Sequence, residues 1–112
     1  MRVGSGVAMA WVYLGLAGVL EVVWAVALKA SEGFTRFVPS AILAVGIAAS
    51  FWFLSRAFRD IPMGTAYAVW TGIGAAGVAI LGMVFYEEPA SLARIGFLSL
   101  IVIGILGLKI TA

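Results

Sequence analysis

The carboxylate of Glu21 is the first candidate for chemistry in this chain. It is the one charged residue of a mostly apolar run from Ala10 to Leu28, and Arg2 and Lys29 flank that run. In a helix with a rise of about 1.5 Å per residue, Glu21 lies roughly 12 Å from Lys29, near the middle of a bilayer. A charge at that depth costs at least about 2.5–3.5 kcal/mol, so we expect Glu21 to face a cavity or a partner and to bind protons or a cation.

Small and aromatic residues recur at helical spacing near this carboxylate and in two later segments. Gly18 and Trp24 lie three residues on either side of Glu21, so the three share one helix face. A small residue leaves room for a second helix or a ligand, while indole and phenol groups supply hydrogen-bond donors and attract cations. The candidate site residues are Gly18, Glu21, Trp24, Ser50, Tyr67 and Trp70.

Each candidate also has a structural interpretation. Tryptophan and tyrosine in membrane helices often anchor at the lipid interface, although Tyr67 and Trp70 lie deeper than such anchors. A serine in a membrane helix usually donates to a backbone carbonyl one turn back, so the role of Ser50 stays open. Glu21 could hold helices together through hydrogen bonds. One unpaired carboxylate per chain is a costly way to do so, which favours a binding role.

The composition indicates a membrane protein. Of 112 residues, 64% are hydrophobic and 11% are charged, whereas a soluble domain is typically about 45–50% apolar and about 25% charged. Four segments are long and apolar enough to cross a bilayer, at about residues 10–29, 36–57, 61–86 and 91–110. We predict an all-α membrane protein in which residues 1–112 form a single four-helix transmembrane domain. Residues 1–8 are expected to be an extra N-terminal segment.

Two residue types that carry much of protein chemistry are absent. The chain has no cysteine and no histidine, which excludes disulfides, thiolate or imidazole metal sites and histidine proton relays. The isoelectric point near 9.4 reflects cations spread over four hydrophobic segments and no basic patch. We therefore expect neither an enzyme nor a nucleic-acid-binding protein, and no cofactor or metal.

Glycines and local signals indicate the helix ends and contacts. Gly33 is expected to end the first helix in a left-handed conformation, and Thr35 to cap the second. Three glycines in the third helix permit close packing or a hinge, and three in the fourth suit packing in a dimer. These are Gly72, Gly74 and Gly77, and then Gly96, Gly104 and Gly107.

Positive charges are balanced between the two sides of the membrane. Four lie on the side of the termini and three on the other, namely Arg2, Arg56, Arg59 and Lys109 against Lys29, Arg36 and Arg94. Orientation normally follows such a bias, so we predict that the chain inserts both ways. The alternative is one orientation set by weaker signals. Two oppositely oriented copies would supply the inverted repeats that larger transporters contain, and this favours an antiparallel homodimer.

A paired acid in such a dimer suggests a mechanism. Two Glu21 carboxylates in a pocket of low dielectric repel each other as anions, and their titrations are coupled. A cation requires them to be ionised, whereas protons neutralise them, so protons and cation compete for the same groups. If the dimer switches between its inward-open and outward-open states only when this site is occupied, the inward movement of protons drives the outward movement of cations.

Three motifs are similar to those of a known family. Segments 18–24, 28–36 and 62–74 read GVLEVVW, LKASEGFTR and PMGTAYAVWTGIG, and Glu87-Glu88-Pro89 also fits. From about Met9 to its C-terminus, the chain resembles the small multidrug resistance family. It is most similar to the guanidinium exporters, which carry tryptophan one turn after the glutamate, as Trp24 does. Drug-exporting relatives carry glycine there, and a tyrosine where this chain has Ile47.

The resemblance implies a proton-coupled antiparallel dimer that exports guanidinium across the bacterial inner membrane. Glu21 would bind substrate and proton, Ser50 and Trp24 would orient its carboxylate, and Tyr67 and Trp70 would line the pocket. A basic residue matching Lys109 is present in this subtype, and it would pair with Glu87 or Glu88. The chain departs from the family in its segment 1–8, and Phe51-Trp52 is closer to the drug-exporting branch.

Two other functions remain as alternatives. One is a broader exporter of quaternary ammonium compounds, which the aromatic residues of the second helix favour and Trp24 disfavours. The other is a membrane subunit that regulates a partner without transporting anything. Only the transporter hypotheses require the charge of Glu21.

Overall fold

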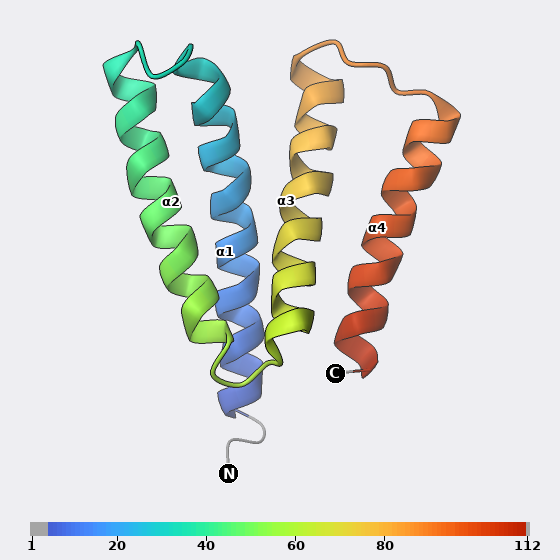
Figure 1. The fold of residues 1–112 in the computed structure, drawn as a ribbon. Coiled ribbons are helices and arrows are strands. Elements are labelled where there is room, and N and C mark those ends of the chain that lie inside the picture. The colour runs from blue at the N-terminus through green and yellow to red at the C-terminus, as the bar shows by residue number, and fades with distance from the viewer. Residues whose placement is uncertain (1–4, 112) are drawn as a thin grey trace.

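The computed structural model describes residues 5–111, which form four helices and the connections between them. The helices are α1 (Ser5–Ala30), α2 (Phe37–Ala57), α3 (Met63–Phe85) and α4 (Leu92–Thr111). Within the described residues, all four are long and apolar enough to span a membrane. The predicted fold class of four transmembrane helices is therefore confirmed, and the chain is a multi-pass membrane protein. Figure 1 shows the start of α1, the end of α4 and the α2–α3 connection at one end, with the other two connections opposite.

The helix bounds differ most from expectation at the start. We expected the first helix to begin near residue 10, yet α1 begins at Ser5. The residues from Gly6 to Met9 are uncharged and mostly apolar, so nothing in them ends a helix. Residues 1–4, Arg2 among them, lie outside the described range.

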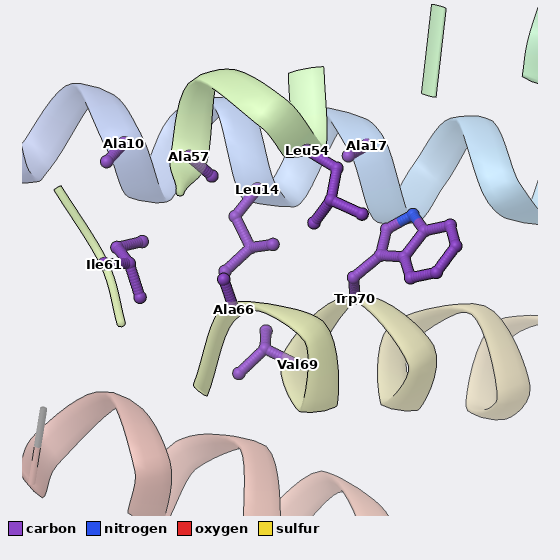
Figure 2. Packing of buried hydrophobic residues seen from close by; sticks show 9 residues of the cluster. All are labelled: Ala10, Leu14, Ala17, Leu54, Ala57, Ile61, Ala66, Val69 and Trp70. Atoms are coloured by element: carbon purple, nitrogen blue, oxygen red, sulfur yellow. The ribbon is translucent and has the colours of Figure 1, made fainter. Parts of the chain in front are cut away.

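The helix α1 lies at the centre of the packing (Figure 1), against both α2 and α3, whereas α4 packs along α3. Alanines bring the helices close, and a few larger side chains fill the space between them (Figure 2). This core consists of Ala10, Leu14, Ala17, Leu54, Ala57, Ile61, Ala66, Val69 and Trp70. Small residues at such contacts are typical of membrane helices, which gain van der Waals packing where backbones approach.

Glycines of α3 allow the closest helix contacts. A Cβ added to Gly77 would lie 2.5 Å from Val22 Cγ2 of α1, and one added to Gly72 would lie 3.0 Å from Ile105 Cδ1 of α4. In α1, Gly18 is packed in the same way against Ile73, at 2.6 Å. Gly72 and Gly77 therefore lie at close contacts with neighbouring helices, as expected for a packing role. The helix α3 continues without a break through both positions.

The turn after α1 follows one local prediction and contradicts another. Gly33 has a φ of +73°, which only glycine adopts without strain, as expected for a helix end. Thr35 was wrongly predicted to cap α2, because the N-cap is Arg36 and no side chain caps that helix. The Thr35 hydroxyl instead donates to Glu32 O at 2.8 Å, which stabilises the turn itself.

Candidate functional site

Glu21 lies on the α1 face that packs against α3. A Cβ at Gly74 would collide with the Glu21 carboxyl group, so the missing side chain of Gly74 makes the space that this group occupies. Glu21 Oε1 is buried and has no hydrogen-bond partner among residues 5–111. An unmade hydrogen bond on a buried polar atom costs about 1–3 kcal/mol. This oxygen therefore indicates a site where a ligand or a second protein chain completes the contacts.

Trp24 lies one turn further along the same face. Its backbone and ring pack on α2 at Gly46, where an added Cβ would lie 2.9 Å from Trp24 Cβ. Trp24 Nε1 is also buried without a partner in the described part of the chain. The carboxyl oxygen and the indole N–H do not satisfy each other, so the orienting contact expected between Trp24 and Glu21 is absent from the single chain.

A cavity of about 440 Å³ adjoins these two side chains. It lies between α1 and α3 and extends to the connection that precedes α4. Its lining consists of Glu21, Trp24, Ala25, Thr71, Gly74, Ala75, Val78, Ala79, Glu88 and Arg94. The volume suits a small organic cation, because ligand pockets usually fall between about 300 and 1,000 Å³.

Ser50 of α2 connects three helices, and it contacts α1 at Ala17, one turn before Glu21. Its buried hydroxyl donates to Ala17 O of α1 at 2.8 Å and accepts from Trp70 Nε1 of α3 at 3.1 Å. Ser50 was expected either to orient the Glu21 carboxylate or to bond a carbonyl of its own helix. Neither contact forms, because the single hydroxyl proton is given to the α1 carbonyl. Within the single chain, Ser50 therefore holds the α1 backbone one turn before Glu21, and its contact with the carboxylate stays a prediction for the dimer.

Tyr67 and Trp70 line a different cavity within the chain. Their ring centroids are 5.3 Å apart, and the Phe51 ring lies 5.7 Å from that of Trp70. Together with six neighbours, Phe51 among them, Tyr67 and Trp70 line a cavity of about 570 Å³ that shares no lining residue with the cavity beside Glu21. Tyr67 is 54% exposed, whereas Trp70 is buried. Four of the six candidates therefore line two separate cavities, Glu21 and Trp24 one of them and Tyr67 and Trp70 the other. Gly18 and Ser50 line neither cavity: Gly18 packs against Ile73, and Ser50 joins Trp70 to the α1 backbone.

Two charged residues of the Glu21 cavity were not among the candidates. Glu88 and Arg94 form an ion pair in which Arg94 Nη2 lies 2.6 Å from Glu88 Oε1. Glu88 was expected as a family-like motif residue and a partner for Lys109, and the spacing of the chain does not reveal that it lines the same cavity as Glu21. Thr71 was also missed, although its position one turn before Gly74 was a usable signal.

The pairing expected for Lys109 was wrong within the single chain. Lys109 Nζ lies over the Trp11 ring, 5.5 Å from its centroid. Lys109 is near the end of α4, whereas Glu87 and Glu88 precede the start of that helix. A helix of this length separates its ends by about 30 Å, so the two charges cannot meet.

The dimer-packing glycines of α4 are open in the single chain. An added Cβ at Gly96, Gly104 or Gly107 would have no atom within 4 Å, and no residue of α4 is buried anywhere along the described helix. Their expected role in a dimer is therefore untested by contacts within one chain.

Comparison with known proteins gives a consistent result. The family model described as Small Multidrug Resistance protein matches residues 9–101. The chain is 58% identical over 104 residues to a guanidinium exporter of Yersinia pseudotuberculosis, covering 93% of this chain and 100% of that protein. It is 54% and 52% identical over 103 residues to the guanidinium exporters of Salmonella typhimurium and Escherichia coli K12, covering 92% of this chain and 98% of each relative.

Proposed function

The chain belongs to the small multidrug resistance family, and we propose that it exports guanidinium from bacterial cells in exchange for protons. It is a membrane protein and not an enzyme, and its relatives named as guanidinium exporters match it over nearly their full length. The bacterial inner membrane is the location that suits a helical protein of this kind.

The observation that carries this proposal is the buried Glu21 oxygen, which has no hydrogen-bond partner in the described part of the chain and lies beside a cavity of about 440 Å³. Guanidinium is planar and presents pairs of N–H groups, which bind a carboxylate through two parallel hydrogen bonds. The Trp24 ring next to the carboxylate adds attraction for a cation. Protonation of the same carboxylate removes the charge that holds guanidinium, so the two ligands exclude each other.

A second copy in the opposite orientation completes the proposed transporter. The single chain leaves α4 without a buried residue, and its glycines are open to a partner helix. Within the described residues, three cations lie at the end of the α2–α3 connection and three at the opposite end (Figure 1). The first three are Arg56, Arg59 and Lys109, and the others are Lys29, Arg36 and Arg94. This balance supports insertion both ways and an inverted pair of identical chains.

Dual orientation has a direct test. Fusion of the chain's C-terminus to a reporter that is active only in the cytoplasm, and separately to one active only outside it, is expected to give signal with both. A variant in which Arg56 and Arg59 are both changed to alanine biases the charges and is expected to shift the signal to one reporter. A C-terminus found on one side alone in the unaltered chain contradicts the antiparallel dimer.

Competition between protons and substrate predicts a pH dependence. Guanidinium binding to the purified protein is expected to weaken as the pH falls through the titration of Glu21, because a protonated acid cannot pair with the cation. Calorimetric titration between about pH 5 and pH 9 measures this. In liposomes, an inward proton gradient is expected to drive guanidinium against its own gradient. An affinity that stays constant over this pH range contradicts the exchange mechanism.

The aromatic cavity favours a second candidate function. Its volume of about 570 Å³ and its Phe51 and Trp70 rings suit larger apolar cations, such as quaternary ammonium compounds. Liposome transport of guanidinium and of a bulky aromatic cation, measured side by side, distinguishes a narrow exporter from a broad one.

A further inference from the structure

The cavity beside Glu21 extends to an ion pair near the ends of the membrane helices. Glu88 lies in the connection between α3 and α4, and Arg94 lies in the first turn of α4. Both line the cavity that also contains Glu21 and Trp24. A cation that reaches Glu21 through this cavity therefore passes the Glu88–Arg94 pair.

The wall between the two carboxylates is small and uncharged. The α3 residues of the lining are Thr71, Gly74, Ala75, Val78 and Ala79, none with a side chain larger than that of valine. They recur every three or four residues and so form one stripe along the helix. Glu21 and Glu88 are the acidic residues of the described lining, which leaves them as the groups able to hold a cation along it.

Glu88 is positioned by backbone contacts, whereas Arg94 reaches it through a long side chain. The Glu88 N–H donates to Gly82 O at 3.1 Å, and an added Cβ on Gly82 would lie 2.5 Å from Glu88 Cδ. The carboxylate is therefore seated against the end of α3. The Arg94 side chain has several rotatable bonds and can leave without any change in the backbone.

We propose that Glu88 is a second guanidinium-binding carboxylate at the mouth of the cavity, and that the Arg94 side chain occupies it until a substrate cation displaces it. The head group of Arg94 is itself a guanidinium, so it makes the same contact with Glu88 as the free cation would. The ligands of this outer site are planar cations with an unsubstituted pair of N–H groups. The proposal rests on the proposed function, because it takes guanidinium to be the substrate.

The Glu88–Arg94 ion pair is partly exposed to water, which favours replacement of Arg94 by a substrate cation. The side chain of Arg94 is 32% exposed and that of Glu88 is 46% exposed. Ion pairs this close to water contribute little to stability, so this one opens readily. While closed, however, the tethered Arg94 competes with the substrate at an effective concentration on the order of millimolar. Removal of Arg94 therefore makes Glu88 more available to dilute guanidinium.

Substitutions of Arg94 and of Glu88 are expected to have opposite effects on guanidinium transport. In liposomes containing the full chain, exchange of labelled guanidinium well below its KM gives kcat/KM. Arg94→Gln is expected to raise kcat/KM about threefold or more, because Glu88 is no longer occupied. Glu88→Gln is expected to lower it about threefold or more, because the outer site is lost and the uncompensated Arg94 repels the cation.

A merely structural ion pair gives a different pattern, because both substitutions remove the same contact and change kcat/KM in the same direction. Changes in the same direction, or no change in either variant, overturn the outer site. Glu87→Gln serves as the control, since Glu87 is adjacent in the chain and lies outside the cavity lining. If Glu88→Gln does not yield folded protein, Arg94→Gln decides alone, and a fall or no change overturns the proposal.

The outer site and the proposed function fail in different ways. An unaltered protein that carries no guanidinium removes both. A second outcome removes the outer site alone. In that outcome the unaltered protein transports guanidinium and Glu21→Gln does not, while Glu88→Gln and Arg94→Gln change kcat/KM in the same direction.

Discussion

Glu21→Gln is expected to abolish the exchange of guanidinium for protons. An amide keeps the size of the side chain but carries no charge and binds no exchangeable proton. Loss of a charge-assisted hydrogen bond costs about 1.5–3 kcal/mol, which is roughly a 10- to 150-fold rise in Kd. Coupling is lost entirely, because no other acidic side chain lines the inner end of the described cavity. The measurement is guanidinium flux in liposomes under a proton gradient, with Kd from calorimetry.

Glu32→Gln is the matched control. Glu32 is an exposed carboxylate in the turn after α1, and its contact with Arg36 is loose, with 3.9 Å between Oε2 and Nε. The same chemical change there is expected to leave flux and Kd unaltered, since such pairs contribute about 0–1 kcal/mol. Proton-driven flux that survives in Glu21→Gln would remove Glu21 from the transport mechanism and favour a role as a regulatory subunit.

Gly74→Ala is expected to weaken guanidinium binding about tenfold or more without touching a charge. The new methyl group would collide with the Glu21 carboxyl group, so either that group moves or α1 and α3 separate. Overpacking of this kind typically lowers the free energy of unfolding by about 1–3 kcal/mol. Replacing glycine in a helix offsets up to about 1 kcal/mol of this loss, so the variant is also expected to unfold at a lower temperature. Calorimetric Kd and thermal unfolding in detergent measure the two effects.

Gly15→Ala separates the collision from the general effect of losing a glycine. Gly15 lies in α1 with Glu21, and an added Cβ there has no atom within 4 Å. Its replacement is expected to keep the unfolding temperature or raise it slightly, with binding unaltered. If Gly74→Ala binds guanidinium as the unaltered protein does, the carboxylate does not depend on the space at Gly74, and the assignment of the site to this face of α3 is wrong.

The sequence indicated the class of the protein and its most important residue. Hydropathy over windows of about 20 residues is a local property, so four membrane helices followed from it without knowledge of their packing. A lone carboxylate at mid-membrane is equally local, because its cost depends on depth alone. The family likeness rests on short motifs around Glu21 and Tyr67, which the matches over residues 9–101 extend to most of the chain.

The tertiary structure decided which residues meet. Membrane helices are apolar on nearly every side, so periodicity gives little information on which face packs against a neighbour. For this reason the spacing did not reveal that Gly74 faces Glu21, or that Ser50 gives its proton to Ala17 O. Likewise, the separation of Tyr67 and Trp70 from the Glu21 cavity depends on how α2 and α3 approach α1. The Glu88–Arg94 pair joins that cavity only because the α3–α4 connection turns back over Gly82. Contacts between helices are set by the fit of side chains from distant segments, which no single segment of sequence contains.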